Sequence, residues 1–599
     1  MPREQKSRRR AWRRRQVRRR RILIGAGVSL LLVVIAATAL AYQGLQVRSS
    51  LVRAESQSRL LQQQIGRNEA SAAKVTLGEL QRSTAEARSG SSGVLWKLAG
   101  KAPLVGSNVR AVSTVSRVLD EIATGVEPVV SAANKVGPSA FTPKDGRLNL
   151  QTIESIRPAL SDANRALTLG VQQLEGINKD GLFGPLQDPI EDLRTKVRDA
   201  RSTTSSGLRA TQLLPEMLGR SGKRSYILAF QNNAEIRSTG GLTGAFAILG
   251  VNDGRLQLES QGAAVDFGFF DPPVVKLTAD ERNLYSNLMA GFWGDTNFTP
   301  DFPRTAQIMR VMMQKKFRKT VDGTVSIDPI ALSYILSGTG PIKLADGSTL
   351  TSKNAVQLLL NQVYLDENND PARQDAYFAD AARRVFDAVA SGQGDPAAVI
   401  RGMARAVGQG RILVQSSHRD EQAILALSEI GGALIGDDGA TPHLGLYLND
   451  STATKLQYYL RRKTSVRAVK CSNAGVQTLS TSTVLSSAAP ANAAQLPDSI
   501  LGPGTGEKRG SMRMNLRFYA PFGGEMTSLA VNGEPKTINF GEHLGRQVAV
   551  VSVLLAPGEK VTVATTIKSG ASQRNSTIFS TTPGIETSPN NVVVKTACD

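Results

Sequence analysis

The spacing of apolar residues changes character several times along the chain. An uncharged run without proline extends from residue 22 to residue 42. Residues 43–212 then carry apolar side chains at helical spacing, and aromatic residues are nearly absent there. This pattern predicts a helical region. We interpret it either as a stalk or bundle that holds the later domains off the membrane, or as a helical domain without a spacing role.

Short strand-like runs alternate with helical patterns between residues 213 and 440. Two apolar runs flank Asn252-Asp253-Gly254, which is a strong signal for the turn of a β-hairpin. Amphipathic patterns typical of helices follow at residues 301–317, 372–390 and 397–410. Strands that alternate with helices predict an α/β or α+β core over residues 213–440.

Apolar and polar residues alternate with a period of two from residue 441 onward. Glycine, proline and Asn-Gly pairs punctuate these runs, and a long connection lies at residues 486–510. The pattern predicts a β-sandwich-like domain over residues 441–599. We find no internal repeat in the sequence.

The apolar run at residues 22–42 is long enough to cross a bilayer, because at 1.5 Å per residue it spans about 30 Å. It is longer than the apolar part of a usual signal peptide, so we predict a transmembrane helix, with a cleaved signal peptide as the alternative. Residues 1–21 hold twelve Lys and Arg, whereas Arg48 and Arg53 are the basic residues close behind the run. The positive-inside rule therefore predicts a cytoplasmic head and an extracytoplasmic remainder, as in a single-pass protein of the cell membrane.

The net charge of +21 does not indicate nucleic-acid binding. The head supplies 12 − 1 = 11 of these charges, and the other 578 residues carry about +10, thinly spread. Such a distribution forms no basic stripe that would grip a phosphate backbone. The hydrophobic fraction of 41% and the charged fraction of 21% are ordinary for folded domains and argue against bulk disorder.

The two cysteines, Cys471 and Cys598, lie near the ends of the last segment. Outside the cytoplasm such a pair predicts a disulfide, which would close a long loop and hold the C-terminus. Two unpaired buried thiols are the alternative. Two cysteines and three scattered histidines do not suffice for a structural zinc site.

A glycine cluster follows Arg237 and supplies the first candidate for ligand binding. Gly240, Gly241 and Gly244 would let the backbone approach an anion closely, or they simply form a turn.

A second cluster contains closely spaced oxygen ligands. Asp295, Asn297 and Asp301 indicate a metal or phosphate site on one interpretation, and the cap of a helix that starts with proline on the other. The chain has no Ser-His-Asp order, nucleophile elbow, metal-binding histidine pair or P-loop, which argues against hydrolase and nucleotide-dependent classes.

These clusters belong to a larger resemblance. Residues from about 213 to 460 resemble the bacterial family catalogued as domain of unknown function 4012 (DUF4012). The segments that carry this resemblance are residues 231–237 (QNNAEIR), the glycines at 240, 241 and 244, and residues 295–303 (DTNFTPDFP), 322–329 (DGTVSIDP), 340–341 (GP) and 446–450 (LYLND). The family implies no established activity.

A more distant resemblance links the order of elements to the LytR-CpsA-Psr phosphotransferases, which move glycopolymers from a polyprenyl pyrophosphate carrier to the cell wall. It rests on residues 321–344, on Arg237, and on the pair Arg373 and Gln374 that opens a helix after an acidic loop. We predict that Arg237, Arg373, Gln374 and the glycine turn bind an anionic group in a common cleft, with the acidic cluster at its rim, because the planar fork of arginine matches phosphate or carboxylate oxygens in pairs. The alternative is that Arg237 pairs internally with Glu235 or a nearby aspartate and braces the hairpin. The chain departs from that family because Ser238 follows Arg237 where the family has an aspartate, and the arginine-rich strand before the Arg-Gln pair is missing.

Together these features predict an α+β multidomain protein. It would contain an N-terminal transmembrane helix, a helical stalk or bundle, a central α/β LytR-CpsA-Psr-like domain and a C-terminal β-sandwich-like domain. The predicted function is to bind or help assemble a cell-wall glycopolymer or a polyprenyl-phosphate-linked intermediate at the bacterial envelope. One alternative is a divergent phosphotransferase, for which Mg²⁺ would be the cofactor. The other is a structural protein that contacts other envelope proteins and has no small-molecule site.

Overall fold

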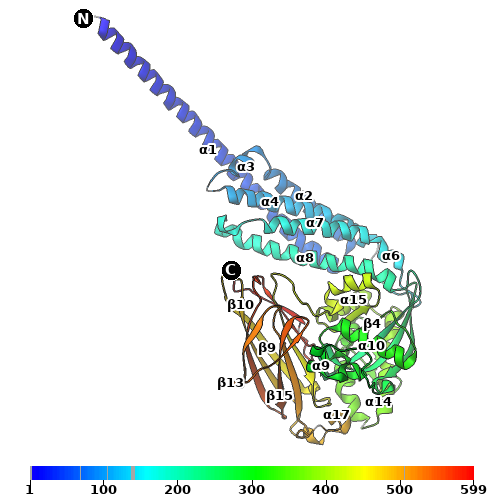
Figure 1. Cartoon of the computed structure of the whole chain (residues 1–599). Coiled ribbons are helices and arrows are strands. Elements are labelled where there is room, and N and C mark those ends of the chain that lie inside the picture. Colours follow the sequence, from blue (N-terminus) through cyan, green and yellow to red (C-terminus); the bar gives the residue numbers. More distant parts are fainter. Residues whose placement is uncertain are drawn as a thin grey trace. The chain divides into compact units, whose positions relative to one another are not determined.

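The computed structural model describes the backbone of residues 3–67, 69–103, 105–135, 142–367, 369–504, 506–587 and 589–598, and the side chains of these ranges apart from residues 3–33 and 133–135. The chain divides into two units (Figure 1). The first comprises residues 1–137 and 151–212, and the second comprises residues 138–150 and 213–599. The predicted boundary near residue 441 falls inside the second unit.

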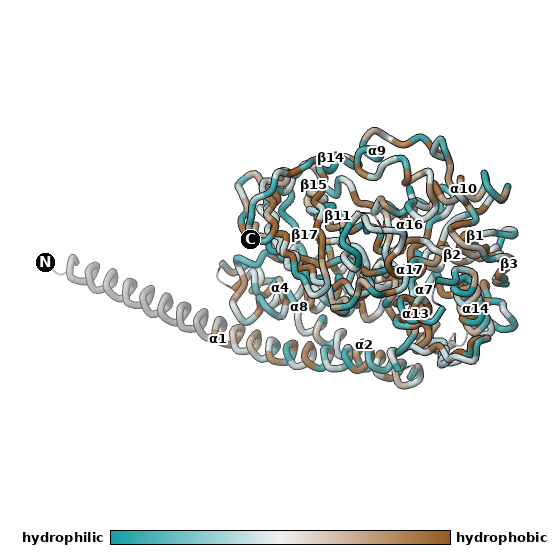
Figure 2. Tube along the Cα trace, turned by 90° about the horizontal axis from the view of Figure 1, so that it is seen from below, coloured by the Kyte–Doolittle hydropathy of each residue, from teal (hydrophilic) through white to brown (hydrophobic). Residues whose placement is uncertain are grey.

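Helices form the first unit because its apolar residues recur at intervals of three and four. Its largest core lies among three helices and includes the buried side chains of Val118 and Leu174. Apolar and polar residues intermingle along the stretch labelled α2 (Figure 2). The helices up to residue 217 are α1 (Arg3–Gly66), α2 (Ala70–Gly90), α3 (Val94–Ala99), α4 (Gly106–Gly125), α5 (Glu127–Lys135), α6 (Leu150–Ser155), α7 (Arg157–Glu175) and α8 (Gly184–Met217).

The predicted transmembrane helix at residues 22–42 is corrected by the structure. Within the described residues, no helix is both long enough and apolar enough to cross a membrane. The basic head at residues 1–21 and residues 22–33 lie outside the residues whose side chains the structure describes. The supported fold class is therefore a mixed α/β multidomain protein.

A five-stranded sheet in the order β3-β2-β1-β4-β7 begins the second unit. The predicted hairpin is confirmed, since β2 and β3 pair in antiparallel fashion and Asp253 and Gly254 turn the chain with positive φ angles. The strands are β1 (Arg224–Arg237), β2 (Gly240–Asn252), β3 (Arg255–Ala263), β4 (Gly323–Ile327) and β7 (Ile412–Ser416).

Helices accompany this sheet, and Figure 1 shows α10, α14 and α15 in the same part of the unit as β4. Trp293 is fully buried among them and stacks on Phe267 with ring centroids 3.9 Å apart. The longer helices are α9 (Ala279–Tyr285), α10 (Phe302–Phe317), α11 (Pro329–Thr339), α14 (Pro371–Ala390), α15 (Pro396–Gly408) and α16 (Arg419–Ala426). The short ones include α12 (Ala355–Gln357), α13 (Val363–Asp366) and α17 (Asp498–Leu501).

Two further sheets follow, as the period-two pattern predicts. One is six-stranded in the order β14-β15-β11-β8-β17-β18, and the other is five-stranded in the order β13-β12-β16-β10-β9. Their shared core contains side chains such as Leu448, Leu479 and Leu516, which have no exposed surface. The strands are β8 (His443–Asp450), β9 (Leu460–Cys471), β10 (Gln477–Ser487), β11 (Met512–Tyr519), β12 (Glu525–Val531), β13 (Glu534–Pro535), β14 (Asn539–His543), β15 (Arg546–Leu555), β16 (Lys560–Lys568), β17 (Thr577–Thr581) and β18 (Asn591–Val594).

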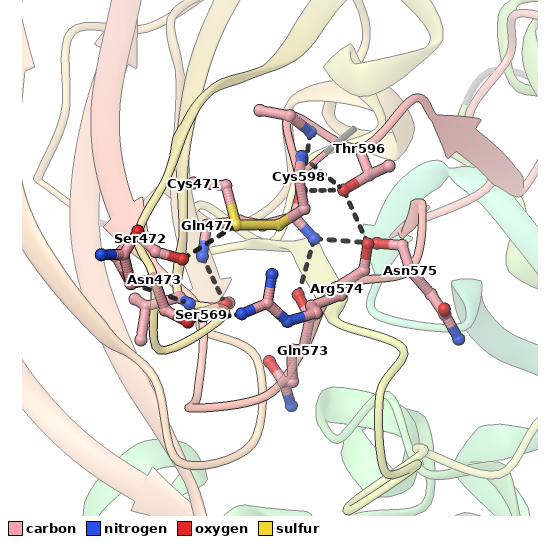
Figure 3. The surroundings of a disulfide bond; sticks show 12 residues. Cys471, Ser472, Asn473, Gln477, Ser569, Gln573, Arg574, Asn575, Thr596 and Cys598 are labelled. Carbon is pink, nitrogen blue, oxygen red and sulfur yellow. Dashed lines mark hydrogen bonds between the residues drawn. A yellow bond between two sulfur atoms is a disulfide. The ribbon is translucent and has the colours of Figure 1, made fainter. Parts of the chain in front are cut away.

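Cys471 and Cys598 form the disulfide that the sequence predicts (Figure 3). Their Cα atoms are 4.9 Å apart, and the bond joins the end of β9 to the C-terminal segment. Oε1 of Gln477 reinforces the closure by accepting hydrogen bonds from Thr596 Oγ1 at 3.0 Å and from the Ala597 amide at 3.2 Å. The disulfide and the side chain of Gln477 together hold the C-terminus on the sheet.

Candidate functional site

Arg237 ends β1, and its guanidinium is buried against a carboxylate. Nε and Nη2 of Arg237 donate to Oδ1 of Asp295 at 3.2 and 3.0 Å. The two side chains are 6% and 10% exposed. The ring of Phe298 lies 4.9 Å from Cζ of Arg237, which adds a cation–π contact. Asp295 and Phe298 both come from the short helix η5 (Trp293–Phe298), so the arginine joins β1 to this helix.

A second buried carboxylate, Asp450 at the end of β8, lies beside the same arginine. Its Oδ2 is 3.9 Å from Nη1 of Arg237, and its side chain has no exposed surface. Its Oδ1 accepts hydrogen bonds from Thr452 and from Gln457. Burial raises the pKa of Asp450 and of Asp295, while the positive charge of Arg237 opposes both shifts. One arginine between two buried carboxylates is the arrangement of an internal brace.

The glycines beside Arg237 are explained by close strand packing. A Cβ atom on Gly241 would lie 2.0 Å from the carbonyl oxygen of Asn232, so β2 approaches the irregular part of β1 too closely for any side chain. Gly240 pairs with Arg237 and has a φ of +138°, which favours glycine. Gly244 has more room, because the nearest atom to a Cβ there would be 3.8 Å away.

The two remaining members of the acidic cluster are also engaged inside the fold. Nδ2 of Asn297 donates to Thr239 Oγ1 at 3.0 Å and to the Gly241 carbonyl at 2.8 Å. Asp301 precedes α10 and accepts a hydrogen bond from the Leu434 amide at 3.0 Å. Among the described residues, no group of three or more His, Cys, Asp or Glu side chains is placed to hold a metal ion. The cluster therefore presents no set of converging metal ligands, and we derive no metal-dependent step from it.

The Arg373-Gln374 pair occupies a different environment. Both residues lie in the first turn of α14, where the side chain of Arg373 is 73% exposed and pairs with Glu367 at 3.6 Å and Asp370 at 3.4 Å. Gln374 is buried, and its Nε2 has no hydrogen-bond partner among the described residues. Among the described residues, the ion-pair partners of Arg373 and those of Arg237 are different carboxylates, so no shared partner joins the two arginines.

The structure adds a polar junction that sequence reasoning missed. The amide of Ser238 donates to Oδ1 of Asn449 at 3.0 Å, and Nδ2 of Asn449 donates back to Ser238 Oγ at 3.0 Å. Oγ1 of Thr582 donates to the Ser238 carbonyl at 3.0 Å. These partners are 211 and 344 residues apart in the sequence, and no local signal connects them. The junction fastens the residues after β1 to β8 and to the chain that follows β17.

A cavity of about 410 Å³ lies at this junction. Ser238, Thr239 and Pro300 line this cavity. The first two precede the glycine cluster and Pro300 precedes Asp301, so both clusters singled out in the sequence border the cavity. Its apolar lining includes Leu413, Leu427, Leu434, Ile435, Leu444, Tyr447 and Ile578. Its further hydroxyl and amide groups come from Ser428, Ser580, Thr581, Asn590 and Asn591.

The charged groups of the cavity lining are largely engaged with the protein. Arg546 is buried and donates to the carbonyl oxygens of Ala520, Ile435, His443 and Tyr519. Asp438 pairs with Nε2 of His443 at 2.9 Å. Glu429 accepts a long hydrogen bond from Asn591 at 3.5 Å. The cavity thus combines two carboxylates with an arginine whose donors are mostly used.

The comparisons with known proteins extend to one part of the chain. A model of the protein family of unknown function DUF4012 matches residues 221–364, which confirms the predicted resemblance over that range. The more distant resemblance to the LytR-CpsA-Psr phosphotransferases is not shown. No curated protein and no solved structure matches the chain.

Proposed function

We propose that this protein binds an uncharged saccharide unit of an extracytoplasmic glycopolymer in the cavity lined by Ser238 and Thr239. The observation that carries the proposal is the mixed lining of this cavity of about 410 Å³, in which hydroxyl and amide groups lie among apolar side chains. A sugar ring presents hydroxyl groups at its edge and C–H groups on its faces, so it uses both kinds of surface. The volume is within the usual range for small-ligand sites, about 300–1,000 Å³.

The charges around the cavity favour a neutral ligand over an anionic one. A phosphate or carboxylate would meet Glu429 and Asp438, which repel it. The one arginine in the lining, Arg546, already donates four hydrogen bonds to main-chain carbonyls. Neutral hydroxyl groups avoid this repulsion and are able to donate to the carboxylates.

Asn590 offers an unused hydrogen-bond acceptor at the cavity. Its Oδ1 is buried and has no hydrogen-bond partner among the described residues. A buried polar atom without a partner is costly to a folded protein, and a ligand hydroxyl would remove that cost. This acceptor supports a ligand that donates hydrogen bonds.

Phosphotransferase chemistry receives less support. Arg237 is held by Asp295 inside the fold, and Arg373 is exposed beside two carboxylates of its own segment. Pyrophosphate would need several uncommitted cations together. We therefore favour binding over group transfer.

The disulfide supports a place outside the reducing cytoplasm. Disulfides persist in oxidising compartments and are rare in the cytosol. The bond between Cys471 and Cys598 closes a stretch of 127 residues within the part of the chain that also forms the cavity. A glycopolymer of the cell envelope is available in the same compartment.

The test uses the full chain with its disulfide intact. An array of neutral and phosphorylated oligosaccharides identifies a binder, and calorimetry then measures its affinity for the parent and for two variants. Asn590→Ala removes an acceptor that has no partner among the described residues, and Asn492→Ala is the matched control at an exposed asparagine outside the cavity lining. We expect Asn590→Ala to weaken binding by about 2- to 10-fold, the effect of one hydrogen bond, and the control to have no effect.

Three outcomes would contradict the proposal. They are an array without any neutral binder, a clear preference for phosphorylated glycans, and equal affinities of the two variants for the neutral binder.

A further inference from the structure

Two buried amide side chains, those of Asn233 and Gln457, line one small cavity. Nδ2 of Asn233 donates to Oδ2 of Asp328 at 3.0 Å, and Nε2 of Gln457 donates to Oδ1 of Asp450 at 2.7 Å. Each NH₂ group therefore faces a carboxylate oxygen, and a flipped amide would set oxygen against oxygen. Oδ1 of Asn233 and Oε1 of Gln457 are consequently directed away from the carboxylates. Both atoms are buried and lack a hydrogen-bond partner among the described residues.

An unused donor belongs to the same cavity. Nη2 of Arg462 donates to the Thr582 carbonyl at 2.8 Å, whereas its Nη1 is buried and without a partner among the described residues. Asn233, Gln457 and Arg462 all line a cavity of about 10 Å³. This is roughly the room that one water molecule requires, and a buried water needs two to four polar partners.

We propose that this cavity binds a single water molecule, which donates to Asn233 Oδ1 and Gln457 Oε1 and accepts from Arg462 Nη1. Two donors and one acceptor are what the three protein atoms require, and a water supplies both functions at once. Three hydrogen bonds are also the typical number for a buried water. Glu586 also lines the cavity, and its Oε1 accepts a hydrogen bond from the Arg462 amide at 3.1 Å. A carboxylate only accepts and a guanidinium only donates, so neither side chain supplies both functions to the two amide oxygens and Nη1.

The water joins two buried ion-pair networks. Asp328, the partner of the first amide, pairs with Arg411 at 2.8 Å, and both side chains are at most 1% exposed. Asp450, the partner of the second amide, lies 3.9 Å from Arg237. A hydrogen-bonded path then runs from Arg411 through the water to Asp450, whose second carboxylate oxygen lies 3.9 Å from Arg237. It links the part of the chain that matches DUF4012 to the C-terminal sheets.

The first test is a crystal structure of the full chain at a resolution of 1.8 Å or better. We expect a spherical density peak within about 2.7–3.2 Å of all three protein atoms, the usual hydrogen-bond range. A site without density would overturn the proposal. A direct bond from Arg462 Nη1 to either amide oxygen would overturn it as well. This measurement needs no variant and decides the question even if substitutions prevent folding.

The second test is a double-mutant cycle in the thermal unfolding midpoint. Asn233→Ala and Arg462→Met each remove one partner of the water, so the combined shift should be smaller than the sum of the single shifts. Arg461→Met is the matched control, because Arg461 is exposed and next in sequence. Its shift should add to that of Asn233→Ala. Additive shifts for the Asn233 and Arg462 pair would show that no water couples them.

Discussion

Replacing Arg237 by alanine isolates the role of the internal brace. The substitution removes the two hydrogen bonds to Asp295 and the nearby positive charge from Asp450. It leaves two carboxylates that are 10% and 0% exposed without their counter-charge. If Arg237 instead served a ligand, its loss would change binding and leave the stability nearly unaltered.

The expected loss follows from the burial of the pair. Removing one partner of a buried ion pair costs about 3–5 kcal/mol, because an uncompensated charge stays in a poorly solvated site. Two carboxylates depend on this guanidinium, so we expect a loss in the free energy of unfolding near the upper end, about 5 kcal/mol. Arg373→Ala is the matched control. Its side chain is 73% exposed, so the expected change is below about 1 kcal/mol.

Urea unfolding followed by the fluorescence of Trp293 measures this loss in the second unit. Trp293 is fully buried there, whereas Trp96 belongs to the first unit. A parent in which Trp12 and Trp96 are replaced by phenylalanine therefore reports on the relevant unit alone. Equal midpoints for the Arg237→Ala and Arg373→Ala variants would refute the brace.

The pH dependence of the loss in the free energy of unfolding provides a second test of the brace. Burial raises the pKa of Asp295 and Asp450, and the substitution removes the positive charge of Arg237 that opposes this rise at both carboxyl groups. The folded variant then binds protons more readily than the unfolded chain, so its stability falls as pH increases. The loss in the free energy of unfolding of Arg237→Ala relative to the parent should therefore narrow as the pH is lowered from 7 toward the ordinary pKa of aspartate, about 3.9. A deficit that is constant over this range would contradict the assignment.

Three further predictions concern other parts of the second unit. Replacing Cys471 and Cys598 by serine opens a loop of 127 residues, for which the chain-entropy model gives a loss of about 5 kcal/mol; an unchanged urea midpoint would contradict this. Gly241→Ala should abolish soluble expression, because its Cβ would lie 2.0 Å from a carbonyl oxygen of β1, whereas Gly244→Ala, with 3.8 Å of room, should express like the parent; similar yields of the two would argue against the packing account. Burial lowers the pKa of His543 to about 4, so the unfolded chain takes up this proton first and stability is lost as pH falls from about 6.5 toward 4. His543→Gln should flatten that part of the profile of melting temperature against pH. Parallel profiles for the variant and the parent would show that His543 does not cause this loss of stability.

Local patterns in the sequence were sufficient for most of the secondary structure. The hairpin around Asp253 and Gly254, the helices before residue 213 and the alternating strands after residue 441 are properties of short stretches of chain. Periodicity and turn chemistry act over a few residues, so they are readable without knowing the fold. The pairing of Cys471 with Cys598 was predictable for a different reason, since the chain contains only two cysteines.

Tertiary structure decided what the candidate residues do. An arginine at the end of a strand followed by glycines fits an anion site and an internal brace equally well. The partners that distinguish them are Asp295 in η5 and Asp450 in β8, and their closeness to Arg237 depends on how these elements pack. The same holds for the cavity beside Ser238, whose lining is drawn from segments between residues 238 and 591. Burial and long-range pairing result from the packing of whole elements, and a side chain's chemistry depends on them more than on its neighbours in sequence.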